Sequence, residues 1–232
     1  MIIRSTIIMS KISTKRLKIS HNIHSISSDV VPLRSRCEWV GLKPHMQKYH
    51  DEEWGVAVHD DRVHFEMLIL EGAQAGLSWD TILNKREGYR KAFKFFDPLL
   101  VSAMTDTELL ELRENKDIVR NKLKIEATRT NASVFLAIQK EHGSFDNYIW
   151  KFVDGTPMHS KRMTLSDIPV KTVESDAISA DLKKRGMKFV GSTIIYAYMQ
   201  AVGLVDDHTD VCWKCRRTDT LWMLVVAAVI YS

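Results

Sequence analysis

The chain has 232 residues, of which 45% are hydrophobic, so it is long enough to bury a substantial core and is not disordered throughout. Its formal net charge at pH 7 is +4. Seven basic residues against one acidic residue give residues 1–36 a charge of +6 and leave −2 for the rest, so any DNA contact requires a local basic patch.

The N-terminal segment, residues 1–35, is rich in Ser, Ile, Lys and Arg and nearly free of acidic residues. This composition is typical of an organellar transit segment, but the segment lacks a clear cleavage context and an apolar central region. We therefore expect a disordered basic extension and a cytoplasmic protein, rather than organellar targeting.

The central segment shows helical periodicity almost throughout and contains no repeat, which predicts an all-α domain over residues 36–215. A Thr105-x-x-Glu108 capping box opens one helix, and Asp97-Pro98 ends another. Further helices are predicted over residues 63–75, 79–96, 122–140, 145–153 and 175–185.

A hairpin is predicted where one helix ends at Gly186 and the next begins near Gly191–Ser192. The backbone N–H groups of Gly191, Ser192 and Thr193 would face a phosphate at the start of the second helix, with Lys188 nearby. This pattern indicates a helix-hairpin-helix element that binds the DNA backbone without reading sequence. An ordinary helical corner with a solvated basic turn is the alternative, which the segment alone slightly favours.

The C-terminal segment, residues 216–232, contains an apolar run from Leu221 to Tyr231. This run is shorter than the roughly 20 residues that a membrane-spanning helix needs. We expect an apolar tail and no membrane association.

Three cysteines, Cys37, Cys212 and Cys215, are too few for a disulfide-stapled scaffold, so reduced thiols or metal ligands fit better. His208-x-x-x-Cys212 would place two ligands on one helical turn, and together with Cys37 and His50 they match a tetrahedral zinc site. Spacing alone leaves two alternatives open, namely stray histidines with buried thiols, and Cys212-x-x-Cys215 as half of a zinc knuckle.

Glu71 lies among apolar neighbours on its predicted helix, and aromatic residues flank it in the sequence. An unpaired carboxylate inside a protein is energetically costly, so a buried Glu71 would indicate a functional group. Pairing with a nearby Lys or capping of backbone amides is the structural alternative. The aromatic residues Trp39, Trp54 and Trp79 likewise fit a plain core.

At these residues the chain resembles the 3-methyladenine DNA glycosylase I family of the helix-hairpin-helix superfamily. The resemblance covers roughly three quarters of the chain, and several motifs in the expected order are more specific than any one. The motifs are Arg36-Cys-Glu-Trp-Val40, Tyr49-His-Asp-Glu-Glu-Trp-Gly-Val56, Leu70-Glu-Gly-Ala-Gln-Ala-Gly-Leu-Ser-Trp79, Phe189-Val-Gly-Ser-Thr193, Gly203-Leu-Val-Asp-Asp-His208 and Cys212.

The resemblance implies one structural zinc ion that joins the N- and C-terminal segments, with Cys215 as a spare thiol. It also implies a pocket for a flipped-out base, in which Glu71 bonds the adenine edge. The zinc ligands it implies are Cys37, His50, His208 and Cys212; the pocket rings are Tyr49, Trp39, Trp54 and Trp79.

The implied reaction is hydrolysis of the N-glycosidic bond of 3-methyladenine in double-stranded DNA, by a monofunctional enzyme that works as a monomer without a protein partner. Asp206 and Asp207 are set aside as catalytic groups because they precede the implied ligand His208. Leu77 is expected to wedge into the duplex, and Met46, where the family tends to carry an aromatic, is expected to loosen base stacking. The alternatives are a zinc-stabilised, non-catalytic DNA-binding module and an inactive relative that binds proteins.

Overall fold

The computed structural model describes residues 35–215, so the predicted basic extension, apart from residue 35, and the predicted apolar tail lie outside the described residues. The described part is mostly helical, as predicted. In this part, no helix is long and apolar enough to cross a membrane.

Helices account for most of residues 35–215, and the two strands are short. The α-helices are α1 (Pro44–Glu52), α2 (Asp61–Gln74), α3 (Trp79–Ala92), α4 (Pro98–Ser102), α5 (Asp106–Glu111), α6 (Lys122–His142), α7 (Phe145–Ile149), α8 (Val173–Lys184) and α9 (Ser192–Ala201). The 3-10 helices are η1 (Glu38–Val40), η2 (Lys94–Phe96), η3 (Leu112–Glu114), η4 (Trp150–Val153) and η5 (Leu165–Asp167). The strands are β1 (Met158–His159) and β2 (Val205–Asp206).

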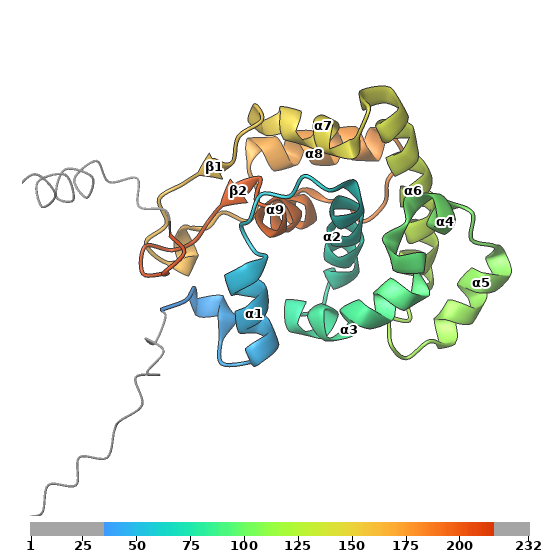
Figure 1. Cartoon of the computed structure of the whole chain (residues 1–232), viewed down its shortest axis with the longest axis horizontal. Helices are drawn as coiled ribbons and strands as arrows, with labels where there is room; N and C mark the ends of the chain where they lie inside the picture. The colour runs from blue at the N-terminus through green and yellow to red at the C-terminus, as the bar shows by residue number, and fades with distance from the viewer. Residues whose placement is uncertain (1–34, 216–232) are drawn as a thin grey trace, which may run out of the picture. The chain divides into compact units, whose positions relative to one another are not determined.

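Helix α2 is central and packs against α3, α6, α7 and α9 (Figure 1). Its first turn is capped by Asp60, whose side chain accepts hydrogen bonds from two backbone N–H groups. Ten consecutive residues of the helix, 64–73, are buried, because neighbours cover it on all sides. A charged side chain within these ten residues is therefore buried in the protein interior. Glu71 is one of them.

The predicted hairpin joins α8 to α9. Helix α8 ends at Lys184, and Gly186, with φ of +101°, adopts a backbone conformation that glycine tolerates best. Gly191 is the N-cap of α9. Gly72 lets α2 approach the hairpin, since a Cβ there would lie 3.2 Å from Phe189 Cβ.

Two predictions about elements are wrong in detail. The helix predicted over residues 79–96 ends at Ala92, because the chain turns through positive φ angles at residues 94–96 and buries both Phe93 and Phe96. The second prediction that is wrong in detail is the all-α domain over residues 36–215, because β1 and β2 form a short parallel pair within it. This pair connects the loop between η4 and α8 to the segment after α9.

Candidate functional site

A cavity of about 280 Å³ lies beside α2 and brings together all five predicted pocket residues. Its walls come from η1, α1 and the turn after it, α2, α3, η5 and the residue after it, and α9. The lining residues are Trp39, Tyr49, Trp54, Glu71, Gln74, Trp79, Leu165, Ile168, Ala197 and Gln200.

The Glu71 side chain is the acidic group of this pocket, and the residue is only 4% exposed. No described residue donates a hydrogen bond to its carboxyl group. Burial raises the pKa of Glu71 to about 8, because the charged form loses its hydration. The Tyr49 hydroxyl has its pKa raised well above the usual value by burial and by the charge of Glu71. The structural alternative, a Glu71 paired with lysine or capping amides, is therefore wrong.

The aromatic rings of the pocket contact one another. The ring centroids of Trp39 and Trp54 lie 5.0 Å apart in an edge-to-face arrangement, and those of Tyr49 and Trp79 lie 5.2 Å apart. The indole Nε1 atoms of Trp39 and Trp79 are buried, and neither has a hydrogen-bond acceptor among the described residues. Flat apolar rings around one carboxyl group form a site suited to a planar cation.

Five of the lining residues were not predicted from the sequence: Gln74, Leu165, Ile168, Ala197 and Gln200. Gln74 and Gln200 stand at the C-terminal ends of α2 and α9. Gln200 could have been predicted as a site residue, because it is a polar residue near the end of a largely apolar helix. Leu165 begins the short 3-10 helix η5 and Ile168 directly follows it, and a helix of three residues has no periodicity that could have indicated them.

Met46 is buried in the core and does not line the cavity, so the structure gives no support to the expected effect on base stacking. Leu77, in contrast, is 42% exposed in the turn between α2 and α3. Its backbone N–H donates to Gln74 O at 2.6 Å. The turn therefore exposes an apolar side chain three residues after the pocket residue Gln74.

Asp207 is fully buried behind the pocket rather than in its lining. Its Oδ1 accepts a hydrogen bond from Arg162 Nε at 2.8 Å, and its Oδ2 accepts from Gln200 Nε2 at 3.0 Å. The Tyr196 hydroxyl also donates to Oδ2. Asp207 thus holds pocket elements in place, which agrees with its exclusion as a catalytic group.

Three of the four predicted metal ligands form a buried cluster. Ligand atoms of Cys37, His50 and Cys212 lie within 4.8 Å of one another. His50 donates from Nδ1 to Asp51 Oδ1 at 2.8 Å, and its Nε2 faces Cys212 Sγ at 3.3 Å. A carboxylate behind a histidine is the usual way to orient a metal-binding imidazole.

His208, the fourth predicted ligand, borders this cluster without joining the group defined by that distance. Its ring centroid lies 5.1 Å from that of His50. Its Nδ1 donates to Asp206 Oδ1 at 2.7 Å, while its buried Nε2 has no partner among the described residues. A buried nitrogen without a partner, on a ring that contacts the His50 imidazole, fits a metal ligand.

The expectation that His208 and Cys212 share a helical turn is wrong. Residues 207–212 are not helical, and two backbone N–H groups in or directly after this stretch donate to distant segments instead. Asp210 N donates to Arg162 O at 2.8 Å, and Trp213 N donates to Ser35 O at 2.8 Å. A loop, rather than a helix, brings these side chains to the cluster.

Apart from Leu77, the predicted DNA-contact residues lie in the hairpin and in the first turn of α9. Lys188 is exposed, and its backbone is fixed by Asn131, whose amide group bonds both Lys188 N and Lys188 O. No side chain caps the start of α9 at Gly191. The Ser192 hydroxyl bonds the Asp176 carboxylate and lowers its pKa, so an acidic group borders the expected phosphate position. Thr193 is exposed.

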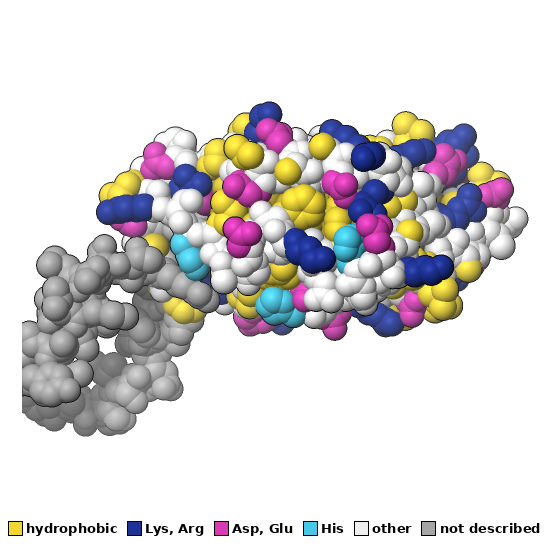
Figure 2. All heavy atoms as spheres, turned by 90° about the horizontal axis from the view of Figure 1, so that it is seen from above, with side chains coloured by type: hydrophobic (Ala, Val, Ile, Leu, Met, Phe, Trp, Pro, Cys, Tyr) yellow, Lys and Arg dark blue, Asp and Glu magenta, His cyan; other side chains and the backbone are white. Residues whose placement is uncertain are grey.

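The face of the domain seen in Figure 2 carries interspersed basic and acidic side chains, without an extended patch of one sign. Attraction of DNA to this face would therefore depend on local contacts.

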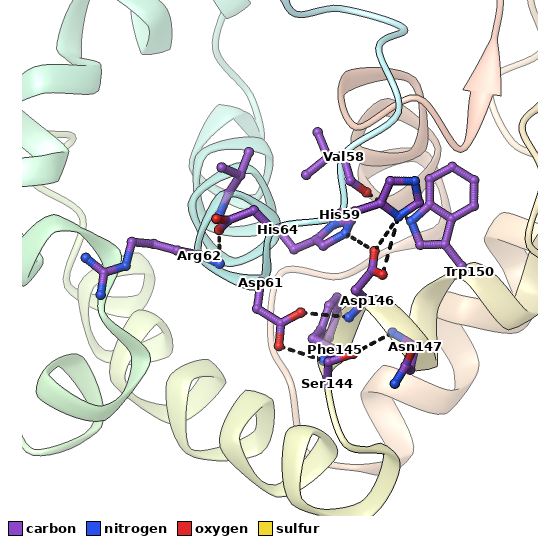
Figure 3. Close-up of polar contacts among 12 residues, drawn as sticks. Val58, His59, Asp61, Arg62, His64, Ser144, Phe145, Asp146, Asn147 and Trp150 are labelled. Atoms are coloured by element: carbon purple, nitrogen blue, oxygen red, sulfur yellow. Dashed lines mark hydrogen bonds and ion pairs between the residues drawn. The ribbon is translucent and has the colours of Figure 1, made fainter.

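A second polar cluster, shown in Figure 3, shares no residue with the pocket. The Asp146 carboxylate bonds His59 Nδ1 and His64 Nε2, both at 3.1 Å. Asp61 accepts from the backbone N–H groups of Phe145 and Asp146, each at 2.8 Å. These contacts join the starts of α2 and α7, and burial lowers the pKa of His64.

Comparison with known proteins adds to this geometry. Residues 39–216 match the family described as methyladenine glycosylase. The chain is 48% identical over 177 residues to DNA-3-methyladenine glycosylase 1 of Escherichia coli K12, a match that covers 76% of this chain and 95% of the relative. It is 44% identical to DNA-3-methyladenine glycosylase of Haemophilus influenzae, covering 78% of this chain and 97% of the relative.

Solved structures of similar proteins share the fold. A crystal structure of 3-methyladenine DNA glycosylase I superposes with a TM-score of 0.77 at 47% identity and covers 78% of this chain and 100% of the other. The Staphylococcus aureus 3-methyladenine DNA glycosylase I, studied for its recognition of 3-methyladenine, gives a TM-score of 0.76 at 34% identity, covering 79% and 98%. The chain therefore belongs to the methyladenine glycosylase family.

Proposed function

We propose that this protein excises 3-methyladenine from double-stranded DNA by hydrolysing its N-glycosidic bond. The observation that carries the proposal is the unpartnered carboxyl group of Glu71 inside an aromatic pocket of about 280 Å³. The relatives named above, which are glycosylases for the same base, support it.

The pocket suits a methylated base because methylation at N3 makes the base cationic while it is still attached to the sugar. Stacked rings and a nearby carboxylate both stabilise a planar cation relative to neutral adenine. The base must leave the duplex to enter such a pocket, and we expect the rings of Tyr49 and Trp79, which contact each other, to stack on it there.

A cationic base is already a good leaving group, so the protein needs mainly to bind the extruded nucleotide and stabilise the transition state. Glu71 would hydrogen-bond the base edge, and its negative charge would favour the positive charge that develops on the sugar. Water would be the final nucleophile, which makes the enzyme monofunctional.

DNA contact is assigned to the hairpin and to the turn after α2. Lys188 and the backbone N–H groups of Gly191, Ser192 and Thr193 would bind a phosphate, and Leu77 would occupy the space left by the extruded base. We expect the protein to act as a monomer without an obligate protein partner.

One structural zinc ion is proposed at Cys37, His50, His208 and Cys212. Two sulfur and two nitrogen ligands match a closed tetrahedral site, and both histidines are oriented by carboxylates. A bound zinc ion would supply crosslinking of the chain rather than chemistry at the base.

The test is to incubate the protein and its Glu71→Gln variant with methylated duplex DNA and to identify the released bases by chromatography. We expect the wild type to release 3-methyladenine, and the folded variant to release at least about a hundredfold less. If the folded wild type binds DNA but releases no base, the alternative of a non-catalytic DNA-binding module takes the place of the enzyme.

A further inference from the structure

The amide of Gln200 lines the pocket and is held from behind by a buried carboxylate. Gln200 Nε2 donates to Asp207 Oδ2 at 3.0 Å, and Asp207 is 0% exposed. The same carboxylate accepts from Arg162 Nε at 2.8 Å and from the Tyr196 hydroxyl. Asp207 is therefore surrounded by donors, one of which is cationic.

These hydrogen bonds to Asp207 determine the orientation of the Gln200 side-chain amide. An ionised carboxylate only accepts hydrogen bonds, so it selects the NH₂ end of the amide. Rotating the amide by 180° would place the Gln200 Oε1 acceptor against the Asp207 Oδ2 acceptor, which is unfavourable in a buried site. The Gln200 Oε1 atom accepts no hydrogen bond from a described residue. It is therefore available to accept one from a ligand in the pocket.

We propose that Gln200 determines specificity in the pocket by accepting an N–H from the amino group at position 6 of the bound purine. The inference rests on the proposed function. A purine with an oxygen at position 6 would face Oε1 with a second acceptor and would lose the bond. Sites built around a hydrogen bond reject analogues that lack the partner more strongly than apolar walls do. Asp207 is a positioning residue, because it acts through Gln200.

The proposal is tested with two free bases that differ at position 6, 3-methyladenine and 3-methylhypoxanthine. Each is titrated into the full-length protein and followed by tryptophan fluorescence, since three tryptophans line the pocket. We expect the wild type to prefer 3-methyladenine by at least about tenfold. Gln200→Met keeps the length of the side chain but removes the amide, and should bring the preference close to one.

Gln74→Met is the matched control, because it removes an amide from the same pocket that no described residue orients. This variant should keep the wild-type preference. Gln200→Ala gives a second measurement if methionine blocks both bases, and circular dichroism checks that each variant is folded.

Three results would overturn the role of Gln200: wild-type protein that binds both bases equally, a preference that survives in both Gln200 variants, or a preference that Gln74→Met also removes. Wild-type protein that binds neither base, and releases none from DNA, would overturn the proposed function as well.

Discussion

Glu71 should give the excision reaction a characteristic pH dependence. Burial raises its pKa to about 8, so the carboxyl group of the free protein is mostly neutral at pH 6.5 and ionised above pH 8. The ionised form favours a cationic base. We therefore expect kcat/KM for 3-methyladenine release to rise about tenfold per pH unit below pH 8 and to level off above it, because kcat/KM reports ionisation of the free enzyme.

The control for this profile is Glu71→Gln, which cannot ionise and should show a flat, low profile over the same range. Spontaneous base loss is subtracted with DNA incubated without protein. A wild-type profile that is flat between pH 6.5 and 8.5 would show that the ionisation of Glu71 does not govern the reaction.

The burial of Glu71 could be anticipated from the sequence, whereas the Gln200 network could not. The apolar neighbours of Glu71 on its helix indicated that it could be buried, which the structure confirms, whereas its proposed role came from the resemblance to the glycosylase family. The orientation of Gln200 depends on Arg162 and Asp207, which come from segments without regular periodicity. Long-range contacts of this kind cannot be obtained from local spacing.

The end of α2, which carries Glu71, is fixed by Lys124 of α6. Lys124 Nζ donates to Ala73 O at 2.8 Å and to Ala75 O at 2.7 Å. A cation at a helix C-terminus satisfies carbonyl groups that have no partner within the helix. We expect Lys124→Met to lower the free energy of unfolding by about 1–3 kcal/mol, measured by urea denaturation.

Lys122→Met on the same helix is the matched control, since Lys122 is exposed and makes only a distant ion pair with Glu126 at 3.8 Å. Its effect should stay below about 0.5 kcal/mol. Equal destabilisation by the two substitutions would show that the bonds to α2 contribute nothing specific.

Helix positions were largely predictable because apolar periodicity and capping residues act locally. The capping box at Thr105 and Glu108 is present, and α6 spans the predicted helix with two more residues at its end. The end of α3 was missed because burial of Phe93 and Phe96 outweighs helical propensity there. Strands β1 and β2 were missed because two residues carry no readable alternation.

The two ends of the described chain are joined around Asp51. Arg36 and Asp51 form an ion pair at 2.7 Å, Trp213 Nε1 donates to Asp51 Oδ1 at 3.2 Å, and Lys214 Nζ donates to Asp51 O at 3.0 Å. The cluster of Cys37, His50 and Cys212 lies at the same junction. A metal ion there would close a loop of more than a hundred residues, which lowers the entropy of the unfolded chain.

We therefore predict one zinc ion per chain, measured by elemental analysis of the purified protein. Removing the ion with a chelator should lower the free energy of unfolding by about 3–5 kcal/mol, by analogy with a crosslink that closes a loop of this length. Cys37→Ala lacks one of the four ligands, so it should bind no zinc. Its midpoint of unfolding should equal that of wild-type protein from which the chelator has removed the ion.

Cys215→Ala is the matched control for the loss of a cysteine, since Cys215 is not among the proposed ligands; it should retain one zinc ion. If the chelator removes zinc without moving the unfolding midpoint, the ionic and backbone contacts around Asp51 are sufficient to join the chain ends, and the ion contributes nothing to stability. If Cys215→Ala loses zinc and Cys37→Ala retains it, the ligand set is wrong.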